Sequence, residues 1–157
     1  MPTIHLTTVI HAPLERVYDL SRSITLHKRS MTHLQEDAIK GRTTGLILLN
    51  ETVTWRAKHL GKMRELTTKI TAMQPLEFFS DEMTAGDFTH LKHAHYFKEI
   101  GNGTVMIDIM DFGTPYGWMG RVFEKIYLNR YMTKLLQLRN RAIKDYAESD
   151  KWRVILE

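Results

Sequence analysis

The fold of this chain is decided by residues 115–150, PYGWMGRVFEKIYLNRYMTKLLQLRNRAIKDYAESD. Apolar residues recur there at steps of three and four, with basic residues mostly between them, so a helix built from this stretch has one apolar side. No proline follows Pro115 and no glycine follows Gly120, so nothing interrupts the predicted helix. Such a helix is about 50 Å long and needs a broad apolar surface to lie against.

The rest of the chain supplies that surface. Short runs of alternating apolar and polar residues, separated by glycine or proline, are typical of antiparallel strands. Helical spacing at 14–22 and 24–29 predicts two short helices after the first strand. The order of elements predicts an α+β fold, in which the concave face of a curved antiparallel sheet is covered by the long C-terminal helix. The predicted strands are 3–11, 34–40, 46–59, 63–73, 77–84, 88–100 and 104–112.

The composition narrows the classes of function. A chain of 157 residues fits one domain, which we place at 1–151, followed by a C-terminal tail at 152–157. The absence of cysteine excludes thiolate chemistry and, with no signal-peptide pattern, predicts a cytoplasmic protein. No apolar run approaches the ~20 residues of a membrane span. The net charge of +4 comes from scattered basic residues, so we expect neither a nucleic-acid partner nor integral membrane association, and leave a homodimer open.

Three sequence motifs lie at the junctions of the predicted elements. The first strand runs through His11-Ala12-Pro13 into the helix Leu14-Glu15-Arg16-Val17-Tyr18, and the last helix begins at Pro115-Tyr116-Gly117. Between them stand His93-Ala94-His95-Tyr96-Phe97, then Gly103-Thr104 and Asp108. With these motifs the whole chain resembles the START-like, Bet v 1-like (SRPBCC) superfamily, and within it the bacterial polyketide cyclase/dehydrase-like ligand-binding group. The resemblance implies an α+β helix-grip fold, in which the curved sheet wraps around the long C-terminal helix. The superfamily includes lipid carriers, secondary-metabolite binders and aromatase/cyclases, so the resemblance implies a cavity between sheet and helix.

Polar side chains fall in the apolar phase of two neighbouring predicted strands. His93 and His95 lie two residues apart on one strand and Asp108 lies on the next, so two imidazoles and a carboxylate can converge. They would then line a pocket, form an acid/base pair oriented by Asp108, or hold a metal with Asp108 or Glu51 as third ligand. A buried network that satisfies only itself, and a surface position, are the alternatives that the pattern leaves open.

Other residues are candidates for the walls of the pocket. Trp55 offers a large flat wall, and Arg64 forms a salt bridge with an acid of the pocket, binds a ligand carboxylate or lies at the edge of the surface. The glycine-flanked start of the last helix, around Trp118, forms either the mouth of the pocket or a hydrophobic cap. The residues expected to bind the ligand are Trp55, Arg64, His93, His95, Phe97, Asp108, Met110, Phe112, Trp118, Met119, Val122, Phe123 and Ile126.

The sequence therefore predicts a protein that binds a small, largely hydrophobic molecule, such as a lipid or a polyketide-like compound. A cyclase- or hydrolase-like enzyme that uses His93 or His95 with Asp108 is the alternative. A protein-interaction module with a filled cavity is the second alternative. We expect no cofactor and no metal, and the sequence leaves the presence of catalytic turnover open.

Overall fold

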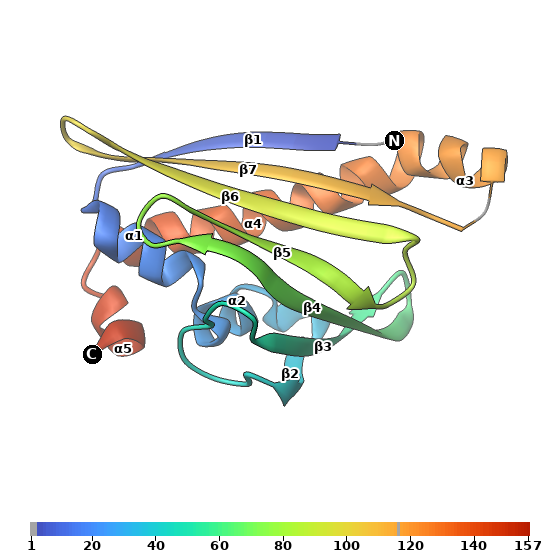
Figure 1. Cartoon of the computed structure of the whole chain (residues 1–157), viewed down its shortest axis with the longest axis horizontal. Helices are drawn as coiled ribbons and strands as arrows, with labels where there is room; N and C mark the ends of the chain where they lie inside the picture. Colours follow the sequence, from blue (N-terminus) through green and yellow to red (C-terminus); the bar gives the residue numbers. More distant parts are fainter. Residues whose placement is uncertain (1–2, 116) are drawn as a thin grey trace.

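Seven antiparallel strands form one curved sheet in the order β1-β7-β6-β5-β4-β3-β2 (Figure 1). The computed structural model describes residues 3–115 and 117–157, with the backbone alone at 118, 120, 121, 124 and 125. This architecture, with short helices after the first strand and a long C-terminal helix, confirms the predicted α+β helix-grip fold. The strands are β1 (Thr3–Ile10), β2 (Asp37–Gly41), β3 (Thr52–His59), β4 (Lys62–Gln74), β5 (Phe78–Ala85), β6 (His90–Ile100) and β7 (Gly103–Gly113).

The alternation of side chains decides which face of the sheet turns inward. In β6 the buried Leu91, His93, His95 and Phe97 occupy every second position. In β7 every second residue from Thr104 to Phe112 is likewise buried. β6 and β7 pair from end to end, with His95 opposite Asp108. The register therefore brings the polar residues of the two strands together on the inner face.

Two short helices follow β1 and close one side of the inner face. They are α1 (Leu14–Ser21) and α2 (Ile24–Ser30), followed by the 3₁₀ turn η1 (Thr32–Leu34). The side chain of Ser23 caps α2 by accepting a hydrogen bond from the backbone N–H of Leu26.

The C-terminal helical segment has three parts: α3 (Gly117–Phe123), the π-helical turn η2 (Glu124–Leu128) and α4 (Asn129–Ala147). The prediction of one uninterrupted α-helix is therefore wrong over five residues. A π-helical turn holds more residues than an α-helical turn, so it shifts the phase of the apolar stripe. Met119, Val122 and Ile126, which precede Leu128, are exposed and do not continue the buried side of α4. In Figure 1, α4 lies behind the sheet and α3 lies at one end of the segment.

The tail predicted at 152–157 folds as a short helix, α5 (Trp152–Leu156). Trp152 and Ile155 pack against the main hydrophobic core, which includes Val17 and Ile143. The guanidinium of Arg16 lies 4.2 Å from the centre of the Trp152 ring, which fastens α5 to α1. Among the described residues, no helix is both long and apolar enough to cross a membrane.

Candidate ligand cavity

A cavity of about 410 Å³ lies between the inner face of the sheet and the helices. It reaches from α1 and α2, past β3 to β7, to α4. Most of its wall is apolar, and charged or polar side chains interrupt the wall at a few places. The apolar and aromatic lining residues are Ile24, Met31, Ile47, Val53, Trp55, Ala57, Leu60, Leu66, Ile70, Phe79, Phe88, Leu91, Met110, Phe123, Leu128, Tyr131, Met132, Leu135 and Leu136.

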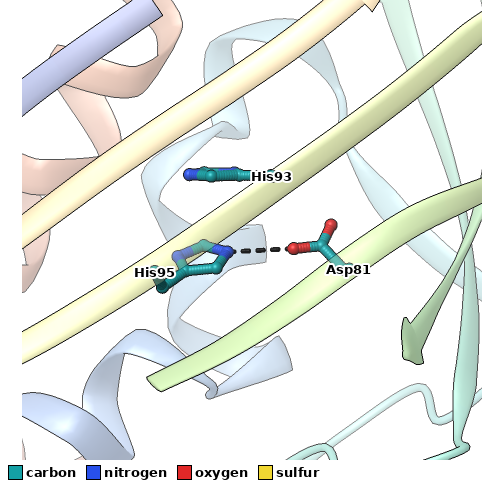
Figure 2. A group of neighbouring side chains, drawn as sticks. All are labelled: Asp81, His93 and His95. Carbon is teal, nitrogen blue, oxygen red and sulfur yellow. Dashed lines mark hydrogen bonds and ion pairs between the residues drawn. The ribbon is translucent and has the colours of Figure 1, made fainter. Parts of the chain in front are cut away.

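The inner end of the cavity is polar, and β5, β6 and β7 build it. His93 Nε2 lies 2.7 Å from Asp108 Oδ1, and His95 Nε2 lies 2.9 Å from Asp81 Oδ1. Figure 2 shows the second of these bonds, with the His93 ring beside the His95 ring. The two imidazoles stack with 3.7 Å between their centres, and His95 also stacks on Phe79 at 4.1 Å. Each histidine is therefore held by a carboxylate on a neighbouring strand and by a ring above or below it.

α4 completes this cluster with two buried polar residues. Arg139 Nη1 lies 3.3 Å from Asp108 Oδ1, and Arg139 Nη2 donates to Ser21 Oγ at 2.9 Å. Asn140 Nδ2 donates to Asp108 Oδ2 at 2.8 Å. Asp108 is fully buried. Both of its carboxylate oxygens accept hydrogen bonds, one of them from the cation Arg139. Removing a charged group from water costs several kcal/mol, and this set of partners offsets that cost.

The environment moves the pKa values of three of these groups. Burial, together with the neighbouring His95, lowers the pKa of His93 to about 4 despite the hydrogen bond to Asp108. Burial alone would raise the pKa of Asp108, but the hydrogen bond from His93, the adjacent His95 ring and the charge of Arg139 hold it well below its usual value. The same competition, led by burial and outweighed by the bond to His95, lowers the pKa of Asp81. At neutral pH both carboxylates are ionised and His93 is neutral.

The hydrogen bonds also determine where the imidazole protons lie. Because Asp108 and Asp81 are ionised acceptors, Nε2 of His93 and Nε2 of His95 are the nitrogens that carry hydrogen. Arg139 Nη2 lies 3.3 Å from His95 Nδ1, which accepts from it. No described side chain donates to His93 Nδ1 or to Asp81 Oδ2. The inner end therefore presents hydrogen-bond acceptors to the cavity, while the donors are used within the cluster.

A metal ion is the other occupant that this chemistry suggests. One ligand atom each from Asp81, His93 and His95 lies within 4.8 Å of the others. An imidazole lone pair lies in the plane of its ring, and the two rings are stacked only 27° from parallel, so they do not aim at one point. His95 would also have to give up its bond to Asp81. Glu51, the other expected ligand, instead pairs with Arg42. The cluster is thus arranged as a hydrogen-bond network.

Three further polar pairs lie along the cavity wall. Arg64 Nη1 bonds Asp87 Oδ2 at 2.9 Å, so the guanidinium is already paired. His59 Nδ1 lies 2.7 Å from the hydroxyl of Tyr131, and burial lowers the pKa of His59. In the third pair His27 packs on Trp55, with 4.5 Å between the ring centres, and its Nε2 lies 3.1 Å from Glu36 Oε1.

The structure brings together some of the expected site residues and separates others. The lining includes Trp55, Arg64, His93, His95, Met110 and Phe123. Asp108 lies behind the histidines, and Phe97 and Phe112 are buried in the core, so these three residues are not part of the wall. Met119, Val122 and Ile126 are exposed and lie outside the lining, because the π-helical turn precedes the buried side of α4. The side chain of Trp118 lies outside the described residues.

Sequence analysis missed three residues of the inner end: Asp81, Arg139 and Asn140. Two of them carry a signal in the sequence. Asp81 lies two residues after the buried Phe79, and hence on the same face of β5. Arg139 lies on the face of α4 that also carries Leu136 and Ile143. A charged residue in an apolar phase indicates a buried partner of opposite charge. Asn140 carries no such signal.

Comparisons with known proteins support the architecture. No protein-family model and no curated protein sequence matches this chain. TTHA0849 from Thermus thermophilus is similar in structure, with a TM-score of 0.71 and 17% identity over 90% of this chain and 97% of that one. CV1439 from Chromobacterium violaceum has a TM-score of 0.71 and 15% identity over 96% and 100%. Major latex-like protein 151 from Panax ginseng has a TM-score of 0.68 and 13% identity over 94% and 98%. At these identities the likeness shows the fold alone, and that fold is the Bet v 1-like helix grip.

Proposed function

We propose that this protein binds a small, largely apolar molecule in the cavity between its sheet and its C-terminal helix. The observation that carries the proposal is the cavity of about 410 Å³, with apolar walls and a polar inner end. Pockets for small molecules commonly span about 300–1,000 Å³ and combine apolar walls with a few convergent polar groups. Burial of the ligand supplies the affinity, and the polar end fixes its orientation.

The walls favour a ligand with a flat or extended hydrocarbon body. Trp55 and Phe79 present aromatic rings to the cavity, and methionines such as Met31 and Met110 adapt to irregular apolar shapes. Each methylene group that leaves water contributes about 0.8 kcal/mol, so a body of about ten carbons is enough for strong binding. A lipid or a polyketide-like compound has such a body. We also propose that this chain belongs to the polyketide cyclase/dehydrase-like group.

Catalysis is the second candidate, and the observation that favours it is the bond between His93 and Asp108. This pair resembles an acid/base dyad, and its histidine lines the cavity. A general base works best when its pKa lies near the working pH, however, and the pKa of His93 is about 4. Simple binding therefore accounts for the site better than turnover. A protein-interaction module with a filled cavity is supported least, because the side chains of the protein leave a cavity of about 410 Å³.

Native mass spectrometry of freshly expressed protein tests the proposal first, because a copurified small molecule would give the mass of a ligand. The cavity itself is tested by filling it. Ala57 lines the cavity and is almost fully buried, so we expect Ala57→Phe to abolish binding of an uncharged fluorescent apolar probe such as N-phenyl-1-naphthylamine. Ala85→Phe, at an exposed position of β5, is the matched control and should leave probe binding unchanged. Equal binding by the two folded variants would contradict a ligand site in the cavity.

A further inference from the structure

We propose that the cavity selects an apolar ligand that carries a positively charged amine, and that the amine binds against Asp81 and His93. This inference rests on the proposed function and adds the chemistry of the ligand's polar group. It follows from the charges and hydrogen-bond roles of the residues that line the cavity.

The arginines of the cavity are all in use. Arg22 pairs with Asp19 at 2.8 Å and Arg64 with Asp87 at 2.9 Å. Arg139 lies 3.3 Å from Asp108 and directs its remaining donors to Ser21, Asn140 and His95. No lysine is among the described lining residues. A ligand carboxylate would therefore find no free cation on the described wall.

Two carboxylates of the cavity, in contrast, have only histidine partners. Asp81 Oδ1 accepts from His95, and Asp81 Oδ2 accepts from no described side chain. The Glu36 side chain is 7% exposed, and its Oε1 has the His27 ring nitrogen at 3.1 Å but no hydrogen bond from any described group. Neither carboxylate is paired with an arginine or a lysine, in a chain whose net charge is +4. A cation entering the cavity would gain from the field of these two carboxylates.

The inner end recognises hydrogen-bond donors. His93 Nε2 is held by Asp108, which leaves Nδ1 as an acceptor, and a ligand atom of Asp81 lies within 4.8 Å of a ring nitrogen of His93. An ammonium group carries three N–H donors and no acceptor, so it matches both sites at once. A hydroxyl carries one donor and satisfies one of them, whereas a carboxylate carries none and is repelled by Asp81. The expected order of affinity is therefore amine, alcohol, carboxylate.

Four probes with one hydrocarbon body separate these classes: 2-naphthylmethylamine, 2-naphthylmethanol, 2-naphthoate and naphthalene. Isothermal titration at pH 7 should give the amine a Kd about tenfold to hundredfold below that of the alcohol, which is the range for hydrogen bonds to charged groups. We expect 2-naphthoate to bind most weakly. Naphthalene binding without a preference for the amine would overturn this inference alone. The failure of all four probes would overturn the proposed function with it.

Asp81→Asn removes one charge and keeps the shape of the side chain. We expect this substitution to raise the Kd of 2-naphthylmethylamine about tenfold or more and to leave the Kd of naphthalene unchanged. Asp111→Asn is the matched control, because Asp111 bonds Thr3 and lies outside the cavity lining. Equal losses in the two variants would contradict the assignment of the amine to Asp81. Titration with Zn²⁺ alone is the remaining test: zinc bound in preference to the amine, and lost in Asp81→Asn, would assign the site to a metal instead.

Discussion

The C-terminal helical segment buries polar residues in one part and exposes apolar residues in another. In α4, Arg139 and Asn140 are 4% and 3% exposed, whereas Met119 in α3 and Ile126 in η2 are 64% and 65% exposed. The two parts differ in what they face. α4 packs against β1, α1 and α2, while α3 lies at the end of the segment (Figure 1). Burial in this segment is therefore set by whether a residue lies over the sheet. The residue type decides only the free energy that burying its side chain requires or releases.

The difference also explains how a charge is tolerated in α4. An isolated buried guanidinium is strongly unfavourable, but Arg139 bonds Asp108, Asn140 and Ser21. These partners come from β7, from α4 itself and from α1. The polar cluster thus ties the helix to the sheet at a fixed register. The exposed residues of α3 have no comparable role in holding the domain together.

The largest effect is expected from removing the buried cation. Arg139→Met leaves Asp108 as an uncompensated buried charge, so we expect the free energy of unfolding to fall by about 3–5 kcal/mol. Urea unfolding followed by circular dichroism measures it. Arg141→Met, at an exposed position of the same helix, is the matched control and should change stability by less than about 0.5 kcal/mol.

The double variant Arg139→Met/Asp108→Asn sharpens this prediction. Because it removes both charges, we expect it to lose less stability than the sum of its two single variants. Additive losses would show that the two residues do not act as a pair. A loss below about 1 kcal/mol in Arg139→Met would mean that Arg139 is exposed to water in solution. The contrast between a buried polar α4 and an exposed apolar α3 would then not hold.

The second effect concerns acid stability. His93 has a pKa of about 4 in the folded chain against an ordinary value of 6.5, so between these pH values the unfolded chain binds a proton that the folded chain does not. Folding stability should therefore fall as the pH drops through this window, by about 1 kcal/mol per pH unit and on the order of 3 kcal/mol in all. The lowered pKa of Asp108 adds a further loss below its ordinary pKa of 3.8. Urea unfolding at several pH values measures the slope.

His93→Gln should remove this part of the slope while keeping a polar side chain against Asp108. His5→Gln, which removes an exposed histidine of β1, is the control for losing an imidazole elsewhere in the chain. An unchanged slope between the ordinary and the lowered pKa of His93 in His93→Gln would assign the acid sensitivity to another group.

The smallest effect is expected at the exposed apolar residues. Ile126→Ser should change the free energy of unfolding by no more than about 0.5 kcal/mol, because the side chain is already in water. Leu136→Ser in α4 is the matched change at a residue that is 5% exposed, and we expect it to cost about 2–5 kcal/mol. A loss of similar size at Ile126 would mean that η2 packs over the domain in solution.

Much of the fold could be predicted because local patterns specify it. The period-two alternation around His93 and His95 indicated the inner face of β6, and the Gly101-Asn102-Gly103 turn joined it to β7. The apolar stripe of the last helix indicated α4. The π-helical turn could not be predicted, because the residues of η2 keep the apolar spacing of an ordinary α-helix. The exposure of Met119 and Ile126 follows from that turn.

The candidate site was predictable only in part. His93, His95 and Asp108 were found because polar residues in an apolar phase stand out in a strand. Their partners could not be assigned. The sequence separates Asp81 and Arg139 from the histidines, and only the pairing of β5 with β6 and the packing of α4 bring them within hydrogen-bond distance.

The sequence by itself determined the α+β order of strands and helices and put the two histidines on the same side of their strand as Phe97, because alternation and helical spacing are local properties of a chain. The tertiary structure decided which charges neutralise one another, and hence that the arginines of the cavity are paired. It also decided where the long C-terminal segment stops covering the sheet. Ion pairs and burial depend on distances between segments that are remote in sequence, and only packing fixes those distances.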